Sequence, residues 1–315
     1  MDSAFKPVVL VFTILAPQDA ARIAAYAELI EAPTPERRAQ AVAQHGDRID
    51  VLLTIGSIGL TAEEIAAMPK LALISALGAG YERIDVDAAR ARGIPVTNGA
   101  GTNDQSVADH TFALLLAVVR DIKTLDQQTR AGVWRTDIPI KPGISGKRLG
   151  ILGLGTIGQH IARRARAFDL SVGYHNRRER ADAGDAAYFA SPRELAQWAD
   201  FFIVATPGGP QTQHLVNAEV LAALGANGYL VNIARGSVVD TQALADALKA
   251  GVLGGAALDV YESEPAPPTV LFDCPNLVLT PHVAGWSPEA IDATVVCFMD
   301  NLARLGAGQP LRNLI

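Results

Sequence analysis

The feature that most constrains the fold is a glycine-rich segment, Gly153–Gly158, with the sequence GLGTIG. It follows a short apolar run predicted to be a strand, 148–152, and precedes a predicted helix, 159–168. Glycines are needed where a chain turns tightly out of a strand, lets a pyrophosphate approach its amides and packs the next helix against the sheet. This context favours a dinucleotide-binding loop over the alternative, a purely structural turn.

A charged segment follows where the adenosine ribose of such a cofactor would lie. In many such folds an acidic residue about twenty positions after the glycines binds the ribose hydroxyls. Asn176 stands near this place, and Arg177 and Arg178 follow it. Guanidinium groups bind a 2′-phosphate through charge-assisted hydrogen bonds, whereas a carboxylate would repel it. The segment therefore predicts NADP(H) as the preferred cofactor, with NAD(H) also possible; the alternative is a solvated charged loop.

Short apolar runs alternate with helical stretches along the whole chain, which is typical of parallel α/β sheets. The strands predicted in the first part are 8–15, 51–54, 71–75 and 96–98. Helices are predicted at 20–30 and 62–68, the second of them started by a capping box of Thr61 and Glu64. These elements predict an open α/β unit of about one hundred residues.

A second set of elements begins after a polar stretch at 141–147. The six strands predicted in it are 148–152, 171–175, 201–205, 229–233, 255–258 and 277–279. Six strands with helices between them are typical of a doubly wound nucleotide-binding sheet. A last helix, 288–306, follows the sheet, and we expect it to pack back on the first unit.

The predicted fold class is therefore α/β, with two doubly wound parallel-sheet domains. A chain of 315 residues is long enough for two separate cores. We expect one domain of residues 1–100 together with 283–315, flavodoxin-like in topology. A Rossmann domain of residues 101–282 would be inserted into it and would bind the cofactor.

Composition narrows the class of partner. A formal net charge of −6 argues against sequence-independent nucleic-acid binding and against anionic membranes, because both need a cationic surface. The apolar run 8–16 is too short to span a bilayer, and charged residues bound the run 107–119. The two cysteines, Cys274 and Cys297, lack metal-ligand spacing, so we expect no metal site and a reducing, cytoplasmic compartment.

Three polar side chains stand just beyond predicted strands, where parallel α/β sheets place their chemistry. They are Arg235, Glu264 and His282. A histidine can protonate the oxygen of a carbonyl that accepts a hydride, and a carboxylate beside it favours the imidazolium. An arginine can bind a substrate carboxylate and polarise the carbonyl. We therefore predict His282 as acid/base, Glu264 as its partner and Arg235 as substrate anchor.

Taken singly, each of the three has a plainer interpretation. Arg235 could form a structural salt bridge, Glu264 could be a loop charge before a proline, and His282 could be a hydrogen-bonded loop histidine. Sequence separation alone does not establish that they meet.

The motifs together resemble those of the D-isomer-specific 2-hydroxyacid dehydrogenases, particularly the glyoxylate/hydroxypyruvate reductase branch. The segments that carry the resemblance are 153–158, 232–240, 258–265 and 281–282, and the similarity covers nearly the whole chain. The resemblance implies hydride transfer between a nicotinamide cofactor and a small 2-keto or 2-hydroxy acid. It also implies that the domain built from both chain ends, 1–100 and 283–315, is the substrate-binding domain, that the active site lies between the domains, and that a homodimer forms largely through the cofactor domains.

Motifs and resemblance together give two sets of binding residues. The predicted cofactor-binding residues are Gly153, Leu154, Gly155, Thr156, Ile157, Gly158, Asn176, Arg177, Arg178, Thr206, Pro207, Ile233, Ala234, Asp259 and Gly285. The predicted substrate-binding residues are Leu77, Gly78, Ala79, Gly80, Arg235, His282 and Trp286.

Several of these binding residues could have another role. The resemblance implies that Asp259 contacts the nicotinamide carboxamide and that the amides of 77–80 bind a substrate carboxylate, although a plain turn would serve equally well there. Trp286 would wall the substrate site or be a core or interface aromatic. Other histidines, among them His110 and His214, receive no role.

The leading hypothesis is an NADPH-dependent reductase that converts glyoxylate, hydroxypyruvate or a similar 2-keto acid to the D-2-hydroxy acid. Reduction of 2-ketogluconate is the runner-up within the same class. A nucleotide-sensing corepressor of the same fold is the alternative from another class. The segment 176–178 argues against it, because that group resembles NAD binders.

Overall fold

The computed structural model describes residues 6–315, which divide into two compact units. Unit 1 comprises the described residues up to Asn103 together with Trp286–Ile315, and unit 2 is Asp104–Gly285. Both boundaries lie three residues after the predicted ones. The first falls at the start of a long helix, and the second falls in the turn after His282.

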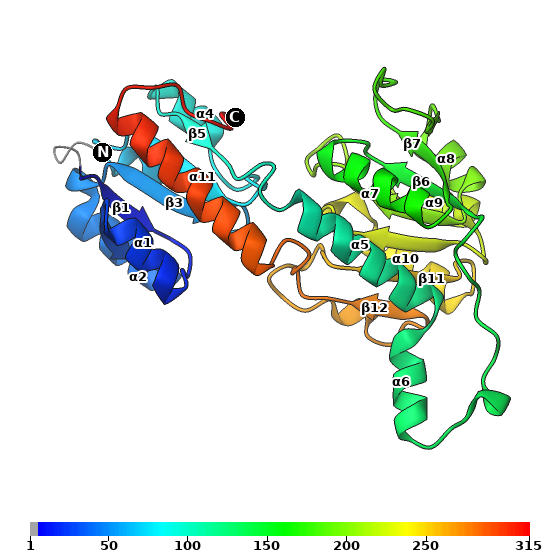
Figure 1. The fold of residues 1–315 in the computed structure, drawn as a ribbon. Helices are drawn as coiled ribbons and strands as arrows, with labels where there is room; N and C mark the ends of the chain where they lie inside the picture. Colours follow the sequence, from blue (N-terminus) through cyan, green and yellow to red (C-terminus); the bar gives the residue numbers. More distant parts are fainter. Residues whose placement is uncertain (1–5) are drawn as a thin grey trace. The chain divides into compact units, whose positions relative to one another are not determined.

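Unit 1 is built on a five-stranded parallel sheet in the order β2-β1-β3-β4-β5 (Figure 1). The strands are β1 (Val8–Val11), β2 (Glu28–Glu31), β3 (Val51–Ile55), β4 (Leu73–Leu77) and β5 (Val96–Thr97). The helices are α1 (Pro17–Ala24), α2 (Pro35–His45), α3 (Ala62–Ala66), α4 (Val86–Ala91) and α11 (Pro288–Gly306). This strand order is that of flavodoxin-like sheets.

Both faces of this sheet are buried because successive side chains of a strand point to opposite sides. Leu10 and Leu52 belong to one apolar cluster, whereas Val9 and Val51 belong to another. Phe298 of α11 lies in the second cluster, so the C-terminal helix completes the core of unit 1 (Figure 1).

The helix predicted at 20–30 is wrong over its second half. Helix α1 ends at Ala24, and residues 28–31 form strand β2, which pairs with β1 alone at the edge of the sheet. The Ala-rich composition before residue 28 favours a helix, and a four-residue edge strand has little periodic signal of its own. The capping box at Thr61 and Glu64 is confirmed.

Unit 2 is built on a seven-stranded parallel sheet in the order β12-β11-β10-β9-β6-β7-β8. The strands are β6 (Arg148–Leu152), β7 (Ser171–His175), β8 (Ala187–Tyr188), β9 (Phe201–Val204), β10 (Tyr229–Asn232), β11 (Gly255–Leu258) and β12 (Leu277–Leu279). The helices are α5 (Asp104–Val119), α6 (Ile122–Arg130), α7 (Thr156–Ala167), α8 (Pro192–Trp198), α9 (Ala218–Leu224) and α10 (Thr241–Lys249). The sequence predicted six of the strands and missed β8, which has only two residues.

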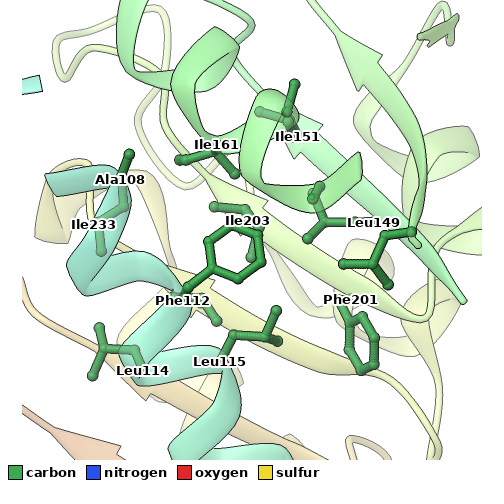
Figure 2. Packing of buried hydrophobic residues seen from close by; sticks show 14 of the residues in the cluster. Ala108, Phe112, Leu114, Leu115, Leu149, Ile151, Ile161, Phe201, Ile203 and Ile233 are labelled. Carbon is green, nitrogen blue, oxygen red and sulfur yellow. The ribbon is translucent and has the colours of Figure 1, made fainter. Parts of the chain in front are cut away.

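Apolar side chains fill both faces of this sheet as well. Figure 2 shows the cluster in which Phe112 and Leu115 of α5 gather with Ile151 of β6 and Ile203 of β9. The strand order reverses between β6 and β9, and in open α/β sheets ligands bind outside the carboxyl ends of the strands at such a point. The predicted fold class, two parallel-sheet domains of which one is a Rossmann domain, is confirmed. No helix within residues 6–315 is long and apolar enough to cross a membrane.

Candidate active site

The glycine loop between β6 and α7 has the shape that a dinucleotide needs. A Cβ on Gly153, whose φ is +102°, would lie 2.7 Å from the amide nitrogen of Thr206. A Cβ on Gly158 would lie 2.3 Å from the carbonyl oxygen of Gly153, so both glycines are required for packing. A Cβ on Gly155 would meet nothing within 4 Å, no side chain caps that residue, and the first turn of α7 has no acidic side chain. The open N-terminus of α7 therefore fits an anionic pyrophosphate.

The predicted ribose segment follows β7 directly. Oδ1 of Asn176 accepts a hydrogen bond from the amide of Leu154 at 2.7 Å, so Asn176 braces the glycine loop. Arg177 is exposed and donates through Nη1 to Oε1 of Gln211 at 2.7 Å, and Arg178 is also exposed. One neutral side chain therefore contacts the glycine loop, and two exposed arginines follow it in the sequence.

The other predicted cofactor residues divide by burial. Thr206 and Pro207 follow the end of β9, beside the glycine loop, and are not buried. Ile233 and Ala234 follow β10 and are only 7% and 6% exposed, and Ile233 is part of the apolar core. Thr206 and Pro207 therefore have more surface available for a ligand than the other two.

His282 and Glu264 are brought together at the carboxyl ends of β12 and β11. The distance from Nδ1 of His282 to Oε2 of Glu264 is 2.8 Å, and the other carboxylate oxygen accepts from the amide of Tyr261 at 2.7 Å. Within residues 6–315, Nε2 of His282 has no hydrogen-bond partner, and 44% of the side chain is exposed. A hydrogen bond at Nδ1 thus orients the ring and leaves Nε2 for a ligand.

His282 and Glu264 shift each other's pKa in opposite directions. The hydrogen bond to Glu264 raises the pKa of His282 above its ordinary value, against the opposing effects of burial and of Arg235. Burial raises the pKa of Glu264, but hydrogen bonding to His282, aided by Arg235, outweighs it and leaves this pKa below its ordinary value. Both shifts therefore favour the imidazolium form of His282 and the carboxylate form of Glu264.

Arg235 stands after β10, between Ala234 and Gly236. Its Nη1 donates to the carbonyl oxygen of Ala234 at 2.6 Å. Its positive charge lowers the pKa of both His282 and Glu264. A Cβ on Gly208 would lie 2.8 Å from Cγ of Arg235, so the small residue after Pro207 leaves room for this side chain. The three predicted catalytic residues therefore influence one another electrostatically.

Asp259 has a structural role that the sequence did not reveal. Its buried carboxylate accepts hydrogen bonds from the hydroxyl of Thr280 at 2.6 Å and from the amides of Val283 and Ala284 at 2.9 and 2.8 Å. These bonds form the turn that holds His282 at a φ of +56°, which is rare for a residue with a side chain. Asp259 thereby shapes the turn that carries the histidine.

His110, which received no role from the sequence, reaches the same turn from α5. Its Nε2 lies 3.1 Å from the hydroxyl oxygen of Thr280 and 3.6 Å from Oδ1 of Asp259. The apolar run 107–119, which contains His110, predicts a buried helix but gives no sign of this contact. Only the packing of α5 against the sheet brings the residues together.

The predicted carboxylate loop, Leu77–Gly80, lies in unit 1 and begins with the last residue of β4. The amide of Gly99 donates to the carbonyl oxygen of Gly78, and Nδ2 of Asn98 donates to that of Ala79, both at 2.7 Å. Within the described chain, no acceptor takes the amides of Ala79 and Gly80. Trp286 is also in unit 1 and is 70% exposed, which rules out a core position within that unit.

The family model described as D-isomer specific 2-hydroxyacid dehydrogenase, NAD binding domain, matches residues 112–284. The chain belongs to this family. The resemblance drawn from the motifs is thereby confirmed, and the protein is an NAD(P)-dependent oxidoreductase of the D-2-hydroxyacid dehydrogenase class.

Individual dehydrogenases of the family resemble the chain over most of its length. It is 39% identical to hydroxyphenylpyruvate reductase of Plectranthus scutellarioides over 86% of each chain. It is 39% identical to 2-ketogluconate reductase of Gluconobacter oxydans, with 80% of this chain and 81% of the other covered. Among solved structures it resembles the NADPH-dependent glyoxylate/hydroxypyruvate reductase of Sinorhizobium meliloti in complex with NADP and malonate. That match has 35% identity, a TM-score of 0.90 and coverage of 99% and 97%.

This dehydrogenase has no metal centre of the usual kind in the part of the chain that the structure describes. Within residues 6–315, no three His, Cys, Asp or Glu side chains are grouped so that they could hold a metal ion.

Proposed function

We propose that this dehydrogenase reduces small 2-keto acids of the glyoxylate and hydroxypyruvate type to D-2-hydroxy acids, with NADPH as the preferred cofactor. The observation that carries the proposal is the 2.8 Å contact between His282 and Glu264, with Arg235 close enough to lower the pKa of both. The names of the similar reductases support the substrate class, since each refers to a 2-keto acid.

The side chains of this protein divide the work of the reduction. When bound, the nicotinamide dinucleotide supplies the hydride that adds to the keto carbon. Arg235 binds the substrate carboxylate and polarises the keto oxygen. The Nε2–H of His282 gives its proton to that oxygen as negative charge develops on it, which leaves a neutral imidazole. Glu264 holds Nδ1–H throughout, so the ring keeps its orientation while solvent restores the proton to its exposed edge.

The loop Leu77–Gly80 of unit 1 is a second proposed anion-binding element. The amides of Ala79 and Gly80 carry no hydrogen bond within the described chain, and the neighbouring carbonyl oxygens are already used. Backbone amides arranged in this way bind carboxylates. Replacing Gly80 with proline would remove one amide, and an unchanged KM for the keto acid in that variant would contradict the assignment.

A panel of 2-keto acids tests the function directly. Glyoxylate, hydroxypyruvate, 2-ketogluconate and hydroxyphenylpyruvate are each added to enzyme and NADPH, and loss of NADPH absorbance is followed. We expect turnover with the smaller acids and formation of the D-isomer. If none of the acids causes loss of NADPH absorbance although NADPH still binds, the result would instead favour a binding module that senses the dinucleotide.

The rate of reduction should fall as pH rises through the pKa of His282. Because Glu264 raises that pKa, the decline should begin above the ordinary histidine range. In the Glu264→Gln variant the pKa of His282 drops, so activity at pH 7 to 8 should fall more than activity near pH 5.5. Initial rates across this range, with chemistry shown to be rate-limiting, check both statements. A flat profile in the wild type would contradict the role of His282.

Cofactor preference should reverse when the charges after β7 are changed. In a double variant, Asn176→Asp keeps an oxygen that can accept from the amide of Leu154, so the glycine loop stays braced. Arg177→Gln removes a guanidinium that would bind the 2′-phosphate. Since charge-assisted hydrogen bonds contribute about 1.5–3 kcal/mol, the ratio of kcat/KM for NADPH to that for NADH should fall at least about tenfold.

The control for this experiment is Arg193→Gln, which removes an exposed arginine of α8 paired with Glu219. Titrations with 2′,5′-ADP and 5′-ADP measure the phosphate contribution without catalysis. If the double variant binds both nucleotides with wild-type affinity, the phosphate site lies elsewhere.

We also propose that the protein is a homodimer joined through unit 2. Helix α6 buries none of its residues, and it extends from the end of α5 away from the sheet of unit 2 (Figure 1). Ile122, Trp134 and Ile140 in and after this helix are 53%, 68% and 99% exposed. Large apolar side chains left exposed are typical of interaction surfaces. Sedimentation of the protein at the single-chain mass of 33.2 kDa would contradict the dimer.

A further inference from the structure

His214, which the sequence left without a function, forms a second histidine–carboxylate pair in unit 2. It lies in the loop that follows β9. Its Nε2 is 2.6 Å from Oε1 of Glu262, and its Nδ1 is 3.8 Å from Oδ2 of Asp240. Its own amide donates to the carbonyl oxygen of Ser237 at 2.8 Å. The residue is therefore fixed to two other loops by both side chain and backbone.

Glu262 extends the contact to the start of α10. Its second oxygen accepts from the amide of Thr241 at 3.0 Å and from the hydroxyl of the same residue at 2.5 Å. Asp240, the neighbouring carboxylate, caps α10 by accepting from the amide of Ala243 at 2.9 Å. One histidine and one glutamate thus connect the loop after β9, the start of α10 and the loop after β11.

These connected loops are the ones that carry the proposed chemistry. Arg235 precedes the segment that leads into α10, and Glu264 lies two residues after Glu262. The backbones are also in close contact here, because a Cβ on Gly236 would lie only 1.9 Å from the carbonyl carbon of Tyr261. A shift of one loop would therefore displace the other.

We propose that the His214–Glu262 pair is a positioning device that holds Arg235 and Glu264 in the geometry needed for proton transfer and substrate binding. The inference rests on the proposed reductase function. His214 and Glu262 act through the loops and are positioning residues, since neither needs to touch substrate or cofactor.

The electrostatics agree with this geometry. The hydrogen bond to Glu262 raises the pKa of His214, and Asp240 adds to the effect while burial opposes it. Burial raises the pKa of Glu262, but hydrogen bonds from Thr241 and His214 outweigh it and lower that pKa overall. Both shifts favour the charged forms of the two side chains, and a hydrogen bond between charged groups is stronger than one between neutral groups.

The test compares His214→Asn, Glu262→Gln and the double variant with the wild-type holoenzyme. Asparagine suits the backbone of His214, whose φ is +49°, but its shorter side chain cannot reach Glu262. We expect each single variant to lose about tenfold in kcat/KM for the keto acid, in both kcat and KM, because small misplacements of reacting groups are costly. The affinity for NADPH, followed by its fluorescence, should stay within about twofold. The double variant should have the same kcat/KM as the less active of the two single variants, since the two residues act as a unit.

Hydrogen exchange supplies a readout that does not depend on activity. The amides of Thr241 and Tyr261 donate to Glu262 and Glu264, so segments 236–243 and 259–266 should exchange faster in His214→Asn. Helix α7 should be unchanged, and His45→Asn in α2 serves as the matched control for the substitution.

The outcomes separate the two proposals. If the wild type reduces no keto acid, the proposed function fails, and faster exchange in His214→Asn still supports the connection between the loops. If the wild type is active and His214→Asn keeps wild-type kcat and KM, the positioning role is overturned, even if the variant melts at a lower temperature. Additive losses in the double variant, or unchanged exchange, would overturn it as well.

Discussion

Replacing His282 with asparagine should lower kcat for 2-keto acid reduction by about 10²- to 10⁴-fold, which is the usual contribution of a positioned general acid. Asparagine retains a side-chain amide and tolerates the left-handed backbone at this position, where φ is +56°. The turn that Asp259 organises through the amides of Val283 and Ala284 should therefore persist. What the variant loses is a group that can release a proton from Nε2. Steady-state rates with the preferred keto acid measure the loss.

The binding of NADPH supplies the internal check on this variant. Because His282 is assigned to the substrate, the fluorescence titration should give a dissociation constant within about twofold of the wild type. His45→Asn, at the end of α2 in unit 1, should keep full activity. If His282→Asn retains more than about a tenth of wild-type kcat with chemistry rate-limiting, another group donates the proton.

The sequence predicts most of the strands, including the edge strand β12, and misses two short ones at the edges of the sheets. The bounds of β6, β7, β11 and β12 coincide with the predicted ones, because each is a compact apolar run between turn-forming residues. Strands β2 and β8 escaped prediction. Strand β2 has only two apolar residues between Glu28 and Glu31, and β8 has only two residues, so neither has a hydrophobic pattern of its own.

The three central residues of the site could be predicted from the sequence because all of them follow predicted strands. Arg235, Glu264 and His282 each follow a strand, and β10, β11 and β12 turn out to be consecutive neighbours in one parallel sheet. Their carboxyl ends therefore lie along one edge, where the distance of 2.8 Å between Glu264 and His282 becomes attainable.

The contacts that hold the site in place could not be predicted from the position of a residue after a strand. His110 reaches Thr280 from a helix 170 positions away in sequence, and His214 reaches Glu262 across 48 positions. Each depends on how a helix or a long loop packs against the sheet, and no local spacing encodes that packing. Residues that position a site are for this reason harder to predict from one sequence than residues that perform its chemistry.

Replacing Arg235 with glutamine should lower kcat/KM for the keto acid by about 10²- to 10³-fold. The guanidinium would bind the substrate carboxylate and stabilise the developing negative oxygen, and the loss of one such donor typically costs this much. KM should rise because ground-state binding is lost, and kcat should fall because charge stabilisation is lost. Lysine at this position keeps the charge but not the planar pair of donors, so Arg235→Lys should be intermediate.

The pH profile distinguishes this role from simple disruption of the site. Arg235 lowers the pKa of His282 in the wild type, so its removal should raise that pKa further. Reduction requires the imidazolium, so the falling limb of the Arg235→Gln profile should move to higher pH, opposite to the shift expected for Glu264→Gln. Arg193→Gln should change neither KM nor the profile. A variant that loses activity with an unmoved falling limb would show that Arg235 does not act beside His282. The falling limb should move in opposite directions in Arg235→Gln and Glu264→Gln only if both charges act on the imidazole of His282.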